Sequence, residues 1–236
     1  MTTTLEAAKA RRSTIALKLL MAVTGAIFIA YVAAHMFGNL KVFQGQQKFD
    51  SYAEFLREFG EPLLPYEGFL WIARVVLLAS LVGHVYAAYT LWARANKARN
   101  VKYSMKKVTT STLSSRTMRW GGTALLLYIA FHLLHLTTKT VGPAGDQPAS
   151  GDDSIYERLV AGFQPEYWYI AVIYLAAQLA LGMHLRHGVY SALQTLGLTN
   201  SPEAKSRASA AALVLAVVIA GGFAIIPLSV LVGIVE

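Results

Sequence analysis

Five long apolar stretches run through this chain of 236 residues and restrict it to one broad class of fold. Each holds about 20 or more mainly apolar residues, which is the length a helix needs to cross a bilayer core of roughly 30 Å. We therefore expect an all-α integral membrane bundle of five transmembrane helices, forming a single domain over residues 1–236. The expected spans are Thr14–Phe37, Phe69–Trp92, Trp120–Leu136, Tyr167–Tyr190 and Ala208–Val235.

The composition agrees with a membrane protein. Hydrophobic residues make up 55% and charged residues only 14%, whereas a soluble domain is about a quarter charged. The chain has no cysteine, so it can hold neither a disulfide nor a thiolate-ligated iron–sulfur cluster. Its formal charge of +8 is better explained by membrane topology than by a nucleic-acid partner.

The distribution of Lys and Arg predicts the orientation. The N-terminal segment and the second and fourth connections carry 15 of the 21 basic residues. The positive-inside rule then places the N-terminus in the cytoplasm and the C-terminus outside, in the cell inner membrane. The first apolar stretch has no small-residue cleavage site after a short core, so we interpret it as a retained helix.

The two outer loops each contain an apolar stripe at helical spacing. Phe49–Phe59 and Ile155–Phe163 predict short amphipathic helices over the outer end of the bundle. Asp153 and Ser154 are candidate N-caps of the second. These helices either pack the bundle or shield a site beneath them.

All six histidines lie inside the apolar stretches. An imidazole in hydrocarbon is costly, so intramembrane histidines are functional candidates. At about 1.5 Å per residue, His84 and His184 both lie roughly 27 Å from the outer face. His35 and the third span's histidines lie nearer that face. Each level thus draws on two helices, as six-coordinate b haems with two axial histidines require, and such haems carry electrons.

Three further residues have alternative interpretations. His135 and His187 each follow a stronger candidate by three residues, so we expect a hydrogen-bonding or haem-propionate role for them. Depth alone slightly favours His135 over His132 as a ligand. Arg74 either pairs with a propionate of the outer haem or extends to the outer interface.

The chain resembles the diheme cytochrome b membrane subunit of succinate dehydrogenases and fumarate reductases, in its five-helix form. The similarity covers roughly residues 13–200. The matching stretches are SxxxxKxxMAxTG (Ser13–Gly25), HMFGN (His35–Asn39), FDSYAEFL (Phe49–Leu56), RVVLLASLVGH (Arg74–His84), RTMRWGG (Arg116–Gly122), FHLLH (Phe131–His135) and HLRHGVYSALQTLG (His184–Gly197).

The resemblance implies the haem ligands. It pairs His35 with His132 at the outer haem, and His84 with His184 at the inner one. The spacing from the RWGG turn is what favours His132. Ser13 and Lys18 would then lie near the inner haem or a quinone. The family usually has Asn where this chain has Asp50, so the resemblance does not identify the residues of the quinone pocket.

The function that the resemblance implies is a membrane anchor of succinate dehydrogenase. It would pass electrons from the iron–sulfur subunit through two b haems to quinone, expected to be menaquinone. A flavoprotein subunit would carry the succinate chemistry. The resemblance also allows the complex to form a higher oligomer. We expect the quinone site at the outer end, with an inner site near Ser13 and Lys18 as the competing location.

Two other classes of function stay in view. One is a diheme quinol-oxidising anchor of another respiratory enzyme, such as a nitrate reductase or hydrogenase. The other is a haem-free transporter whose histidines relay protons. A redox difference spectrum separates the transporter from the anchors, and the co-purifying subunits separate the anchors from each other.

Overall fold

A computed structural model describes residues 13–97, 113–142 and 154–236. Within those ranges the regular structure is helical and contains no strand. Five of the described helices are long and apolar enough to cross a membrane, which confirms the predicted fold class and makes the chain a multi-pass membrane protein. Most of the basic second connection and the candidate cap Asp153 lie outside the described residues.

The membrane-spanning helices extend beyond most of the predicted bounds. They are α2 (Thr14–Leu40), α4 (Gly68–Lys97), α5 (Leu113–His132, followed by the π turn Leu133–Thr137), α7 (Trp168–Thr195) and α8 (Pro202–Leu231). α8 begins six residues before the predicted start because the Ser201 hydroxyl accepts a hydrogen bond from the Ala204 amide at 3.1 Å. Pro202 then occupies the first turn, where its missing N–H costs nothing.

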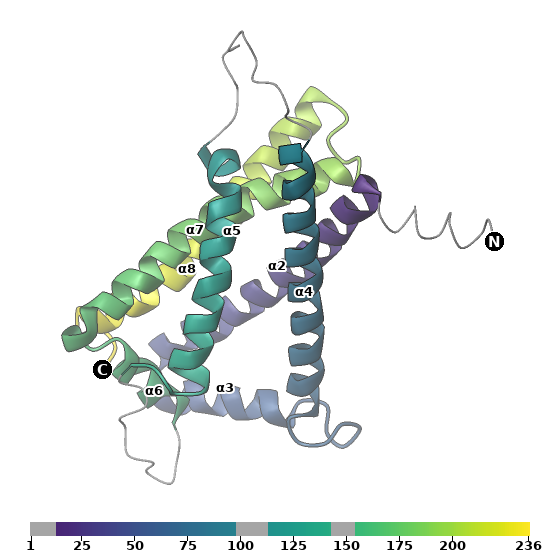
Figure 1. Cartoon of the computed structure of the whole chain (residues 1–236). Helices are drawn as coiled ribbons and strands as arrows, with labels where there is room; N and C mark the ends of the chain where they lie inside the picture. The colour runs from purple at the N-terminus through teal and green to yellow at the C-terminus, as the bar shows by residue number, and fades with distance from the viewer. Residues whose placement is uncertain (1–12, 98–112, 143–153) are drawn as a thin grey trace.

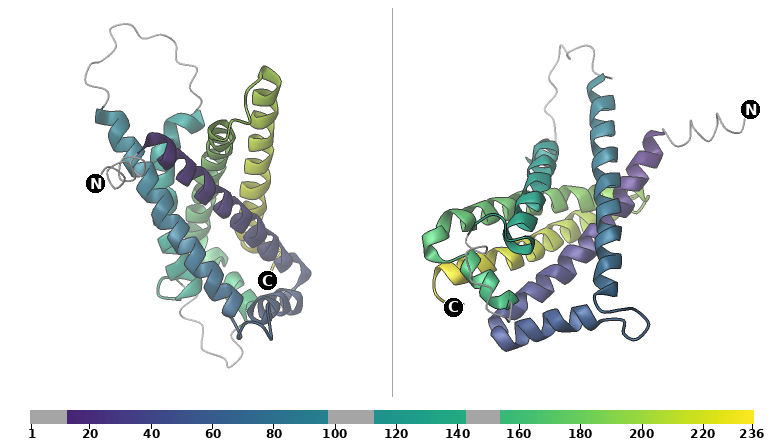
Figure 2. Two further views of the ribbon diagram at one scale, coloured as in Figure 1. Left: turned by 90° about the vertical axis from the view of Figure 1, so that its right-hand side faces the viewer. Right: turned by 60° about the horizontal axis from the view of Figure 1, so that its bottom comes forward.

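Some pairs of membrane-spanning helices pack closely, whereas others have little contact. α7 and α8 run side by side, α2 crosses both of them, and α5 packs against α7 at a steep angle (Figures 1 and 2). α4 packs against α2, and among the described helices it makes no comparable packing with α5 or α7. Side chains from α4 that reach toward α7 must therefore cross the space between the two helices.

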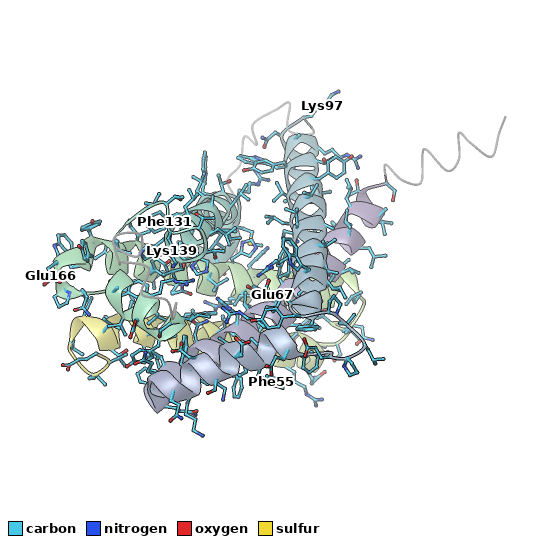
Figure 3. The ribbon with its side chains drawn as sticks, turned by 90° about the horizontal axis from the view of Figure 1, so that it is seen from below. Phe55, Glu67, Lys97, Phe131, Lys139 and Glu166 are labelled. Carbon is cyan, nitrogen blue, oxygen red and sulfur yellow. The ribbon has the colours of Figure 1, made fainter. Side chains whose placement is uncertain are left out.

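Both predicted amphipathic helices form at one end of the bundle. They are α3 (Gln46–Glu58) and α6 (Ile155–Gly162), and Figure 3 shows α3 lying across this end. Ser154 caps α6, as predicted, by accepting from the Glu157 amide at 3.2 Å. Asp50 of α3 accepts from the Ser154 hydroxyl at 2.7 Å and from the Tyr156 amide at 3.1 Å. These bonds join α3 to α6.

A hydrophobic core lies beneath these two helices. Phe49 of α3 and Phe163 beyond α6 are buried with Ile170 of α7 and Ile226 of α8. Gly38 on α2 allows α3 to approach closely, since a Cβ there would lie 2.7 Å from the Tyr52 ring. The amphipathic helices thus have a packing role. A role in shielding a site stays a prediction.

Candidate functional site

The first histidine pair brings together α2 and α5. The rings of His35 and His132 meet edge to face, with their centroids 6.0 Å apart. Tyr31 stacks on the His35 ring with an interplanar angle of 12°, and Phe223 of α8 lies 5.7 Å from it. The Nδ1 of His132 lies 3.2 Å from the Tyr174 hydroxyl of α7.

The second pair brings together α4 and α7. The ring centroids of His84 and His184 lie 6.2 Å apart with an interplanar angle of 51°. His84 Nδ1 lies 2.9 Å from the Thr24 hydroxyl of α2. His184 Nδ1 is buried and has no hydrogen-bond partner within the described part of the chain. This pair spans two helices that make little direct packing.

Two glycines each face one ring of the second pair. A Cβ at Gly122 of α5 would lie 3.3 Å from His184 Cε1, and a Cβ at Gly25 of α2 would lie 3.7 Å from His84 Cε1. Gly25 precedes His35 by ten residues, and Gly122 precedes His132 by ten. At 1.5 Å of rise per residue, both helices therefore separate the two histidine pairs by about 15 Å. The predicted two levels correspond to this spacing.

The residues present fit b haem. In each pair two imidazoles from different helices face each other with ring centroids 6.0 or 6.2 Å apart, and imidazole is a common haem ligand. No group of three or more His, Cys, Asp or Glu among the described residues could hold a bare metal ion. A porphyrin supplies four nitrogen ligands of its own, so two histidines complete its coordination.

His135 occupies a different environment from the four paired histidines. Its side chain is fully buried, with 0% exposure, whereas the paired histidines are half-buried. Phe131 stacks on its ring, and Gly142 and Gly162 approach so closely that a Cβ at either would lie 3.0 Å from a ring carbon. Its Nδ1 lies 3.0 Å from the Tyr174 hydroxyl. The geometry thus brings His132, and not His135, against His35.

The ion pair and the ring contact of Arg74 are with residues other than the paired histidines. Arg74 lies 3.4 Å from the Glu67 carboxylate and over the Trp71 ring, at 4.7 Å. Figure 3 shows Glu67 near the base of α4 at the α3 end, which places this ion pair at that end of the bundle. Its propionate role stays a prediction.

Within the described part of the chain, no hydrogen bond or ring contact joins Ser13, Lys18 or His187 to either histidine pair. Ser13 accepts a hydrogen bond from the Ala16 amide at 3.0 Å and so caps α2. Lys18 is exposed on the second turn of that helix, and His187 is half-buried one turn beyond His184.

Sequence reasoning missed several neighbours of the histidines. Thr24 and Tyr174 hydrogen-bond to ring nitrogens, and Gly122 clears space beside His184. Gly38 follows His35 by three residues and Gly188 follows His184 by four, so each is on its histidine's helix face and could serve a porphyrin or the helix packing. The structure places Gly38 beneath Tyr52 and Gly188 beside Met118. The available signal was that Thr24 and Gly122 fall within matching stretches that we quoted above.

Comparison with known proteins identifies the family. A family model described as the succinate dehydrogenase/fumarate reductase transmembrane subunit matches residues 93–224, more than half of the chain. The matched region includes α5, α7 and most of α8, and it contains His132 and His184. No curated protein and no solved structure matches.

Proposed function

The chain belongs to the succinate dehydrogenase/fumarate reductase transmembrane subunit family, and on that premise we propose that it carries electrons between its complex and membrane quinone through two b haems. His35 and His132 would hold one haem, and His84 and His184 the other. Each haem, when bound, takes up and releases one electron at a time. The family membership disfavours the nitrate-reductase, hydrogenase and transporter alternatives.

The observation that carries the proposal is the pairing of four histidines from four different helices. Each pair has a ring separation of 6.0 or 6.2 Å, and within each pair one Nδ1 contacts a hydroxyl. A hydrogen bond at Nδ1 orients the ring and leaves Nε2 for the metal. This supports ligation more than it supports four unrelated buried histidines.

The partners follow from the chemistry that this chain lacks. It has no cysteine and so no thiolate ligands for an iron–sulfur cluster. An iron–sulfur subunit and a flavoprotein subunit would therefore supply the electrons from the side that carries most of the Lys and Arg. The cytoplasmic position of that side is part of the proposal.

The quinone would react at the end of the bundle covered by α3 and α6, near His35 and His132. A chain with a single reaction site beside the iron–sulfur subunit would gain nothing from a second haem about 15 Å farther away. Moving one charge fully across the membrane costs about 2.3 kcal/mol per 100 mV. Turnover through the outer site would therefore respond to the membrane potential.

Two measurements test the proposal. A pyridine haemochrome assay of the purified complex should give about two haems per copy of this chain, as two bis-histidine sites require. A ratio near one or zero would contradict it. Succinate–quinone turnover in sealed vesicles should change when an uncoupler is added. If the uncoupler has no effect and the His35→Ala variant still reduces quinone normally, the working quinone site lies elsewhere.

A further inference from the structure

Thr24 makes two contacts that together determine where its hydroxyl proton lies. Its side chain is buried, with 5% exposure, on the face of α2 that meets α4. Its Oγ1 lies 2.7 Å from the Leu20 carbonyl oxygen, one turn earlier on α2, and 2.9 Å from His84 Nδ1. The Met21 carbonyl oxygen is a more distant acceptor for the same hydroxyl, at 3.3 Å. A helical threonine often donates to the carbonyl four residues earlier. Thr24 differs from such a threonine in that its hydroxyl also contacts an imidazole, that of His84.

The two contacts can both be hydrogen bonds in only one arrangement. A hydroxyl has a single proton and two lone pairs, and a carbonyl oxygen can only accept. Thr24 must then donate to Leu20 and accept from His84. The neutral imidazole of His84 therefore carries its proton on Nδ1, and Nε2 keeps the free lone pair that a metal ligand needs.

The partner ring has no corresponding contact. His184 Nδ1 is buried without a hydrogen-bond partner among the described residues. Phe28 and Gly25 border the His84 ring, and neither side chain provides a hydrogen-bonding group. The backbone carbonyl of Met21 is a second acceptor for the His84 ring and favours the same tautomer. Among the described side chains, Thr24 is the one that hydrogen-bonds to a ring of this pair.

We propose that Thr24 is a positioning residue that holds His84 in the Nδ1–H tautomer and tunes the reduction potential of the haem it ligates. This inference rests on the proposed function. A hydrogen bond accepted from Nδ1–H raises the basicity of the ligand. A more basic axial ligand stabilises the ferric state over the ferrous state, so the Thr24 hydroxyl lowers the potential of that haem.

The test compares Thr24→Val with Thr24→Ser in the complex purified with its own subunits. Val keeps the branched shape and removes the acceptor, whereas Ser keeps the hydroxyl. In a redox titration, one haem of the Val variant should have a higher reduction potential than in the wild type. The preference for the ferric over the ferrous state should fall about tenfold, which corresponds to a rise of about 59 mV for a one-electron couple. The Ser variant should retain the wild-type potential, and the second haem should not change in either variant.

Thr123→Val is a matched control. Thr123 also donates to the carbonyl four residues earlier, at 3.0 Å, and contacts a side chain on another helix, Tyr89, at 2.8 Å. It should leave both potentials unchanged. Loss of one haem in the Val variant with retention in the Ser variant would also support the proposal.

Three outcomes would overturn the inference. They are a Val variant with the wild-type potential, equal shifts in the Val and Ser variants, and loss of the haem in both. The last two would assign Thr24 to packing alone. A wild-type complex without b haem would instead contradict the proposed function, so the two failures are distinguishable.

Discussion

His35 and His132 face each other across the bundle, edge to face, with ring centroids 6.0 Å apart. The side chain of His135, one turn farther along the same segment, is enclosed by Phe131, Phe163 and two glycines. The two histidines of the FHLLH stretch are thus directed into different surroundings.

Replacing these two histidines should therefore have different effects. We expect His132→Ala to remove one of two haems, because that haem would lose an axial ligand. His135→Ala should leave both haems bound and lower the thermal stability of the complex, since it opens a cavity and leaves the Tyr174 hydroxyl without one contact. Haem-to-protein ratios and thermal unfolding measure these effects. The opposite pattern of haem loss would assign the ligand to His135.

Gly122 should be essential for the haem between His84 and His184. A Cβ at this position would lie 3.3 Å from His184 Cε1, so Gly122→Val should displace the ring and halve the haem content. Gly121→Val is a matched control on the adjacent residue, where a Cβ would meet nothing within 4 Å. Equal haem loss in both variants would indicate a general effect on α5.

Arg74 provides a test of electrostatics near His35. Arg74 lies two turns into α4, and His35 lies in the last two turns of α2, so both are near the end of the bundle that α3 covers. Removing a positive charge makes the reduced, more negative haem less favourable, so Arg74→Leu should lower the potential of the His35–His132 haem and leave both haems bound. A redox titration measures the potential of this haem. Arg57→Leu is the control, because Arg57 also pairs with Glu67 but is on α3 and not on a membrane-spanning helix. An unchanged potential would leave Arg74 with its interfacial role only.

The contact between α3 and α6 should depend on the carboxylate of Asp50. Asp50→Ala removes the acceptor for both the Ser154 hydroxyl and the Tyr156 amide, and we expect a loss of about 1–3 kcal/mol in stability. Asp50→Asn should lose less, because one carbonyl oxygen remains to accept from Tyr156. Thermal unfolding of the complex measures both changes, with Lys48→Ala on the exposed face of α3 as control. Equal stability of the Ala, Asn and Lys48→Ala variants would show that the Asp50 carboxylate does not stabilise the contact between α3 and α6.

The sequence by itself determined the features that depend on local patterns. The five spans and the two amphipathic helices follow from the period and length of apolar runs. Most helix ends lie beyond the predicted ones, as at the start of α8, where the Ser201 side chain caps the helix. The two levels of histidines follow from a constant helical rise. Such properties need no knowledge of which helix packs against which.

Only the tertiary structure decided which groups surround each ring. The residues one turn apart in FHLLH both reach Tyr174, yet packing under α6 encloses His135 and leaves His132 facing His35. Likewise, the rotation of α2 about its axis directs Thr24 to His84 and Gly38 to Tyr52. Side-chain surroundings depend on the mutual rotation and spacing of helices distant in sequence, and packing of many side chains together sets both.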